Sequence, residues 1–261
     1  GFDGLVLDWE YPVCWQLDCK GNPEEKKRFS DLLRELHFKF QPKNLLLSAH
    51  VHPYKHISVL SYDIPTLTRY LDWIVIVSYC LRGGWDRRTM DCNPIHHLAY
   101  AMRHWQNSGV PLKNLIVGIP FFGTTYRLAN VKDRKLGAPI TEPGKPDNFT
   151  DNFLMYNEIC HNIKVDSWSV RRDVTSGNGR VTYTFKGDKW VHFDNVLDIK
   201  DKAQFIIKNG FGGAMVKSLD YDDFSNKCGK GKYPLLTALN KELNPSVKKN
   251  TTDIENCYRY I

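Results

Sequence analysis

GFDGLVLDWEYP, residues 1–12, is the stretch on which the interpretation of this chain depends. Its side chains alternate with period two, which predicts a β-strand. Asp8 and Glu10 then lie on one face of the strand, a few ångströms apart, and Pro12 ends it. Two carboxylates this close raise the proton affinity of one of them, so Glu10 suits a general acid with Asp8 as its partner. The alternative is a pair of acidic residues that only cap a loop or bind lysines.

The composition limits the class of protein. The chain has 261 residues and is 42% hydrophobic, enough for one large domain or for one with an inserted subdomain. No run of about 18 apolar residues occurs, so we expect no membrane span. The net charge is +7, but Lys and Arg are scattered rather than interleaved with aromatics, which argues against nucleic-acid binding. Nothing in the composition indicates an oligomeric state.

Other features suggest where the protein resides. Seven cysteines leave at least one thiol unpaired within the chain if the others form disulfides. Asn148 and Asn250 each begin an N-glycosylation acceptor pattern, which has meaning only in a secreted protein. Residue 1 is a glycine inside a strand pattern, without an initiator Met or a signal peptide, so we expect a piece of a longer, secreted, extracellular protein.

Strands and helices alternate along most of the chain, which predicts a parallel sheet with right-handed crossovers. After the first strand, the expected strands are 44–52, 72–79, 115–122 and 213–219, and the expected helices are 24–40, 64–70, 95–106, 198–209 and 233–243. Gly123 is expected to break the fourth of these five strands. The stretch 126–194 is rich in Gly, Pro and short aromatic runs, and we interpret it as a small inserted α+β module, with a possible helical turn at 153–159.

Five segments in order resemble the glycoside hydrolase family 18 chitinases, particularly the arthropod type. Residues 2–12 resemble the family signature D-x-x-D-x-D-x-E, and 45–51, 72–79, 118–123 and 212–224 resemble its later strands. The resemblance implies a (β/α)8 TIM barrel, present here from about strand 4 onward, with the α+β insertion before strand 8. It divides the chain into barrel portions 1–125 and 195–245, an insertion at 126–194 and a C-terminal extension at 246–261. A barrel without strands one to three has two open edges, so we expect this segment alone to fold poorly.

The resemblance also implies site residues. Glu10 would protonate the glycosidic oxygen, the substrate's N-acetyl oxygen would attack the anomeric carbon, and Asp8 and Tyr79 would orient the acetamido group. The other implied substrate contacts are Trp9, Tyr11, Trp85, Phe122, Met215 and Lys217. A disulfide is implied between Cys160 and Cys228. The implied ligand is chitin or its N-acetylglucosamine oligosaccharides, and no cofactor is implied.

At five positions the chain departs from the family pattern. Val6 replaces an aspartate on the face of Asp8, and Cys80 replaces another after Tyr79. Phe122 and Thr124 replace a tyrosine and an arginine, and Lys217 replaces the tryptophan that forms a flat platform under the sugar. Each lost contact costs about ten- to a thousand-fold in rate where it acts in the transition state. We therefore expect chitin recognition with weak or no hydrolysis; the alternative is an active secreted endo-chitinase that uses Glu10.

His50 and His52 share a face of the expected strand 44–52. With Asp8 or Glu10 they could form a zinc site, but we favour two space-filling histidines and predict no metal. Cys14 and Cys19 lie in one loop, and either a local disulfide or pairing outside this segment stays open. The partners of Cys80, Cys92 and Cys257 also stay open.

Overall fold

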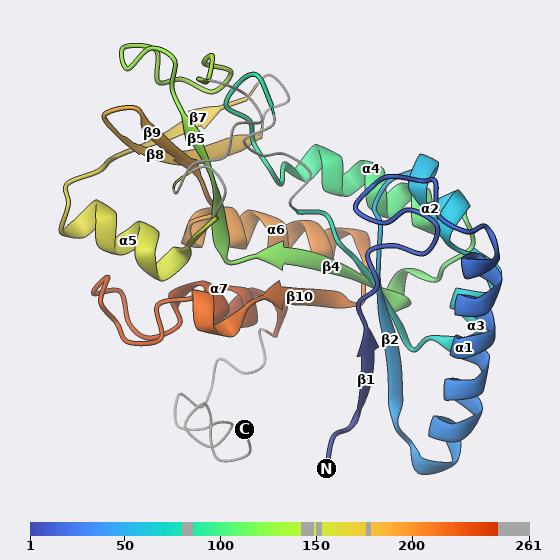
Figure 1. Ribbon diagram of the computed structural model, residues 1–261. Coiled ribbons are helices and arrows are strands. Elements are labelled where there is room, and N and C mark those ends of the chain that lie inside the picture. The colour runs from blue at the N-terminus through green and yellow to red at the C-terminus, as the bar shows by residue number, and fades with distance from the viewer. Residues whose placement is uncertain (80–85, 142–148, 150–152, 176–178, 245–261) are drawn as a thin grey trace.

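A five-stranded parallel sheet forms the larger part of the fold (Figure 1). The computed structural model describes residues 1–79, 86–141, 149, 153–175 and 179–244. The strand order is β1-β2-β3-β4-β10, and each neighbouring pair is parallel. The strands are β1 (Gly4–Leu7), β2 (Leu46–Val51), β3 (Trp73–Ile76), β4 (Leu115–Pro120) and β10 (Gly213–Lys217).

Helices connect the parallel strands and cover the sheet. They are α1 (Glu24–Phe40), α2 (Lys55–Ser61), α3 (Ile64–Tyr70), α4 (Ile95–Asn107), α6 (Val196–Asn209) and α7 (Pro234–Leu243). Short 3-10 segments lie at Gln41–Lys43, Leu112–Asn114 and Leu219–Tyr221. Leu33, Leu67, Leu98 and Ile206 bring apolar helix faces into one core with the buried strand residues. The expected helices are present within a few residues, while α2 was not anticipated. None of the described helices is long and apolar enough to cross a bilayer.

A second, antiparallel sheet lies beyond the carboxyl end of β4, at the upper left of Figure 1. Its order is β6-β5-β9-β8-β7, and α5 (Tyr156–Lys164) follows β6. Tyr126, Tyr183 and Trp190 give this sheet its own core, with the last two rings stacked 4.9 Å apart between centroids. The strands are β5 (Phe122–Arg127), β6 (Leu154–Met155), β7 (Ser169–Val174), β8 (Arg180–Lys186) and β9 (Lys189–His192).

The expectation that Gly123 ends a strand was wrong. Only Phe121 separates β4 from β5, and Gly123 lies inside β5. A Cβ at Gly123 would lie 2.5 Å from the carbonyl oxygen of His192 and 2.7 Å from Ile159 Cδ1, so this glycine permits close packing rather than a break. The expected boundary between residues 125 and 126 falls within β5.

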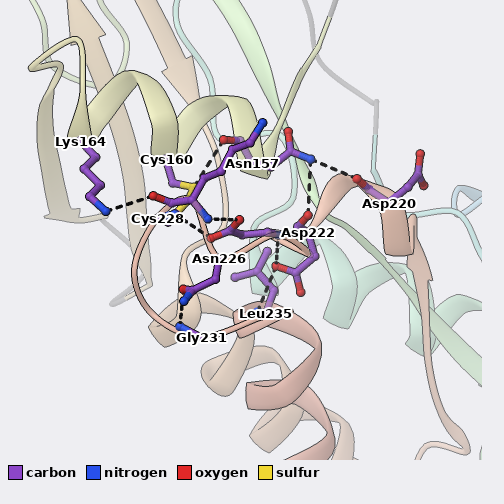
Figure 2. Close-up of a disulfide and its surroundings, with 11 residues drawn as sticks. Asn157, Cys160, Lys164, Asp220, Asp222, Asn226, Cys228, Gly231 and Leu235 are labelled. Atoms are coloured by element: carbon purple, nitrogen blue, oxygen red, sulfur yellow. Dashed lines mark hydrogen bonds between the residues drawn. A yellow bond between two sulfur atoms is a disulfide. The ribbon is translucent and has the colours of Figure 1, made fainter. Parts of the chain in front are cut away.

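The segment after β10 is fastened to the second sheet (Figure 2). A disulfide joins Cys160 on α5 to Cys228, as the family resemblance implied. Asn157 Nδ2 donates to the backbone oxygens of Asp220 and Asp222, at 3.0 and 3.4 Å. The Asp222 carboxylate accepts the backbone N–H of Leu236 at 2.9 Å, in the first turn of α7. These contacts fix the chain that leaves Lys217.

Two buried ion pairs connect the antiparallel sheet, at or just after β9, to other parts of the chain. The Lys202 ammonium on α6 binds the Asp194 carboxylate just after β9, and both side chains are buried. Asp91 Oδ1 lies 3.1 Å from His192 Nε2 on β9, with 13% and 6% of the side chains exposed. Burial raises the pKa of Asp91, but the charge and hydrogen bond of His192 outweigh it and lower that pKa to about 2. Burial alone would lower the pKa of His192, but the charge of Asp91 outweighs burial and holds this pKa well above its usual range.

Asp91→Asn is expected to lower the free energy of unfolding by about 3–5 kcal/mol at pH 7, because it leaves a buried imidazolium without its partner. Since Asp91 has a depressed pKa, its contribution is present above about pH 4 and is lost as the pH falls toward 2. Denaturant unfolding at several pH values measures both effects.

Asp188→Asn is the matched control for this substitution. Asp188 pairs with Arg127 at 2.7 Å but is 43% exposed, so its loss is expected to cost less than about 1 kcal/mol. Equal effects of the two substitutions at pH 7 would contradict the assignment.

Candidate active site at the carboxyl ends of the parallel strands

The residues expected in the site follow the carboxyl ends of parallel strands. Asp8 and Glu10 follow β1, which ends at Leu7 and is therefore shorter than expected. Tyr79 follows β3, and Lys217 is the last residue of β10. In sheets of this kind, loops at the carboxyl ends meet at one side of the sheet, where ligands bind.

Glu10 has the electrostatics of a general acid. Its residue is exposed, yet the neighbouring atoms withdraw enough water from the carboxyl to raise its pKa. The negative charge of Asp8 raises the pKa of Glu10 further, as the sequence predicted for two adjacent carboxylates. Both effects favour the protonated form that can donate a proton.

Two basic side chains act against this effect. The Lys217 ammonium lowers the pKa of Glu10, and His50 lowers it to a smaller extent; the net shift stays upward. His50 Nδ1 lies 3.0 Å from Asp8 Oδ1, at ion-pair distance but without the alignment of a hydrogen bond. Lys217, at the position where the family resemblance implied an aromatic platform, thus brings a charge that acts on the pKa of the candidate acid.

Three expected contacts gather in a small apolar cluster. Tyr79 and Phe122 are buried edge to face, with ring centroids 5.9 Å apart, and Met215 packs against them. Gly118 on β4 allows this approach, because a Cβ there would lie 2.8 Å from Tyr79 Cε1. The cluster lies at the carboxyl ends of β3, β4 and β10.

Two further aromatic residues, which the sequence did not indicate, extend this cluster. Phe153 lies 4.8 Å from Phe122 and 5.2 Å from Tyr221 between ring centroids, and its residue is 42% exposed. Tyr221 follows β10 in the segment that Asn157 holds (Figure 2). The sequence could have identified Phe153 only if it had predicted that the chain before α5 returns to the carboxyl ends of the parallel strands.

Tyr62 is another residue that the sequence did not indicate. Burial, then the nearby Tyr11 hydroxyl and the charges of Glu10 and Asp8, raise its pKa well above its usual range. The phenol therefore stays protonated beside the two carboxylates. Its signal in the sequence was weak, because it follows the unanticipated helix α2.

Trp9 and Tyr11 do not join the carboxylates. The Trp9 ring lies edge-on to Phe29 of α1, at 6.0 Å between centroids. Tyr11 is 5% exposed and packs in the main core, 5.0 Å from His52 between ring centroids. Neither residue lies in the Tyr79 cluster.

His52 does not form a metal site with His50. Strand β2 ends at Val51, so the two histidines do not share a strand face as expected. His52 is buried, its Nδ1 accepts the backbone N–H of Tyr54 at 3.1 Å, and burial lowers its pKa to about 4. In the part of the chain that the structure describes, the one cluster of potential metal ligands is Cys160, Asp223 and Cys228, and its two cysteines are disulfide-bonded.

The remaining expectations divide into two groups. Cys14 and Cys19 form a local disulfide, and Cys92 is a free, buried thiol. The expected contact Trp85, the replaced position Cys80, the glycosylation sites Asn148 and Asn250, and Cys257 lie outside the described residues.

Comparison with known proteins gives one consistent result. The catalytic domain 2 of the Group II chitinase of Ostrinia furnacalis has a TM-score of 0.85 and 38% identity, over 94% of this chain and 67% of that one. Probable chitinase 10 of Drosophila melanogaster is 40% identical over 93% of this chain, which spans 11% of that protein. Human YKL-39, described as a pseudo-chitinase with retained chitooligosaccharide binding, has a TM-score of 0.76 and 31% identity, over 93% of this chain and 69% of that one.

The similarity to these structures shows that the parallel sheet belongs to a TIM-barrel-like fold. The chain spans between 11% and 55% of the length of the curated relatives that it matches. The profile of the glycosyl hydrolases family 18 matches residues 1–222. The chain therefore belongs to glycosyl hydrolase family 18.

Proposed function

We propose that this chain is part of a secreted domain that recognises chitin, the β-1,4-linked polymer of N-acetylglucosamine, and hydrolyses it weakly or not at all. The observation that carries this proposal is that Lys217, the last residue of β10, brings a positive charge that lowers the pKa of Glu10. A lysine offers no flat surface for a sugar ring, and its charge favours the ionised form of the acid. Human YKL-39 supports the combination of binding with lost activity, because it is described in those terms.

Binding in this proposal uses the aromatic cluster at the carboxyl ends of the parallel strands. Tyr79 and Phe122 are buried with Met215 packed against them, while Phe153 offers an exposed aromatic surface beside Phe122. Sugar rings pack well on such aromatic faces. Two disulfides within the described residues agree with an oxidising, extracellular environment. The glycosylation sites, the domain limits and the barrel strand numbers stay predictions.

The alternative is an active endo-chitinase, and the raised pKa of Glu10 favours it. In this mechanism Glu10 donates its proton to the glycosidic oxygen, and the N-acetyl oxygen of the substrate forms the bond to the anomeric carbon. Asp8 would stabilise the positive charge that develops on the acetamido group. In this chain Asp8 lies against His50, and Val6 is 53% exposed where the family has a further carboxylate.

Binding and turnover of a chitin pentasaccharide by the full-length protein test the proposal. We expect saturable binding without turnover, and a Glu10→Gln variant that keeps its affinity because it keeps the shape of the side chain. Calorimetry and product chromatography measure the two quantities. Glu35→Gln, an exposed position on α1, is the control. Turnover that disappears in Glu10→Gln but persists in Glu35→Gln would establish the alternative, and absence of binding would refute both functions.

Lys217→Met is expected to raise the pKa of Glu10 further, because the substitution removes the positive charge that lowers it. Glu10 would then hold its proton to higher pH. Carboxyl-carbon NMR titration of Glu10 measures this shift directly. Lys232→Met changes an exposed lysine that does not affect the pKa of Glu10, and it should leave the titration unchanged. A Glu10 pKa that stays constant or falls in Lys217→Met would contradict the assigned role.

A further inference from the structure

The loop closed by the Cys14–Cys19 disulfide presents an exposed tryptophan. Trp15 is 64% exposed and Leu17 is 56% exposed, while Val13 and Cys14 at the base of the loop are buried. Large aromatic side chains gain free energy when their surface is removed from water. A single exposed apolar residue is common on protein surfaces. What is unusual here is that a disulfide holds the loop that carries it.

The loop is held in one conformation by many contacts. Besides the disulfide, the backbone N–H of Asp18 donates to the Trp15 carbonyl at 2.9 Å. At the base, the backbone N–H of Val13 donates to Glu25 Oε2 on α1 at 2.7 Å, and that of Gly21 donates to the Val13 carbonyl at 2.9 Å. The backbone at Trp15 is therefore already ordered before a ligand binds, which lowers the entropic cost of binding.

The backbone of this loop is also strained. Val13, Gln16 and Leu17 have φ angles of 67°, 45° and 71°, in the left-handed region that favours glycine. None of the three is a glycine, and Val13 is β-branched, for which this region is particularly unfavourable. Such conformations persist where surrounding contacts enforce them, and they are concentrated at functional sites.

The loop begins at the candidate acid. The backbone N–H of Gln16 lies 3.5 Å from the Glu10 carbonyl oxygen, so the loop folds back onto the Glu10 backbone. Trp15 is five positions after Glu10 in the chain, which limits their Cα distance to about 18 Å. Since the loop follows β1, it lies at the same carboxyl ends as Tyr79 and Lys217.

We infer that Trp15 is a stacking platform for a chitin chain, separate from the Glu10 site and reached only by a polymer or long oligosaccharide that extends beyond it. The inference rests on the proposed function, because the same chain occupies both places. The platform compensates in part for the surface lost with Lys217. A sugar ring presents a face of C–H groups that packs on an indole, and the disulfide holds that indole ready.

Binding of colloidal chitin and of N,N′-diacetylchitobiose to the full-length protein tests this role. Trp15→Ala is expected to weaken chitin binding about 3- to 10-fold, the effect of one aromatic stacking contact, and to leave the disaccharide affinity unchanged. Trp15→Phe should restore most of the chitin affinity. Trp73→Ala is the matched control, because Trp73 is 44% exposed but begins β3 at the opposite, amino end of the sheet. It should bind both ligands like the wild type.

The outcomes separate this inference from the proposed function. Wild-type levels of chitin binding in Trp15→Ala would overturn the platform while the proposed function stands. Equal losses in Trp15→Ala and Trp73→Ala would also overturn it, because the effect would not be specific to the loop. A wild-type protein that binds neither ligand would refute the proposed function.

Discussion

Parallel pairing of β1, β2, β3, β4 and β10 is the constraint on which the rest of the structure depends. It forces each connection to cross the sheet, so helices cover one side and every strand ends at the same edge. Side chains that are more than two hundred residues apart in sequence, such as Glu10 and Lys217, therefore come close enough for the Lys217 charge to lower the pKa of Glu10. The antiparallel sheet then begins one residue after β4 and adds Phe122 and Phe153 to the same edge.

At the carboxyl ends of the parallel strands, the pKa of Glu10 is set by opposing electrostatic effects. Burial and Asp8 favour protonated Glu10, whereas Lys217 and His50 favour its ionised form. Water screens such opposing charge effects only in part at a protein surface. The Asp8–His50 contact has a second consequence, because a carboxylate that faces an imidazole is less available to stabilise positive charge on a substrate.

Local pattern predicted the helices and strands well, since apolar periodicity reflects burial in either element. It also predicted that Asp8 raises the pKa of Glu10, because alternate residues of a strand share a face. It failed where distant segments decide the outcome. From the sequence, Gly123 was predicted to break a strand. In the structure it lies inside β5, where β9 and α5 approach so closely that a side chain would not fit. His52 lies just beyond the end of β2, and Trp9 packs on Phe29; neither position follows from residue type alone.

Loss of catalysis and loss of binding need not occur together at such a site. Only contacts that strengthen in the transition state accelerate the reaction, whereas contacts of equal strength in both states contribute to affinity alone. By the family resemblance, Val6 and Lys217 stand at positions where the family has groups that act on the reacting sugar. In the proposed function, the aromatic surfaces of Phe153 and Trp15 would hold bound sugar equally in both states. A domain that kept the second kind of contact and lost the first kind would hold a polysaccharide without cutting it, which is the behaviour that the proposed function expects.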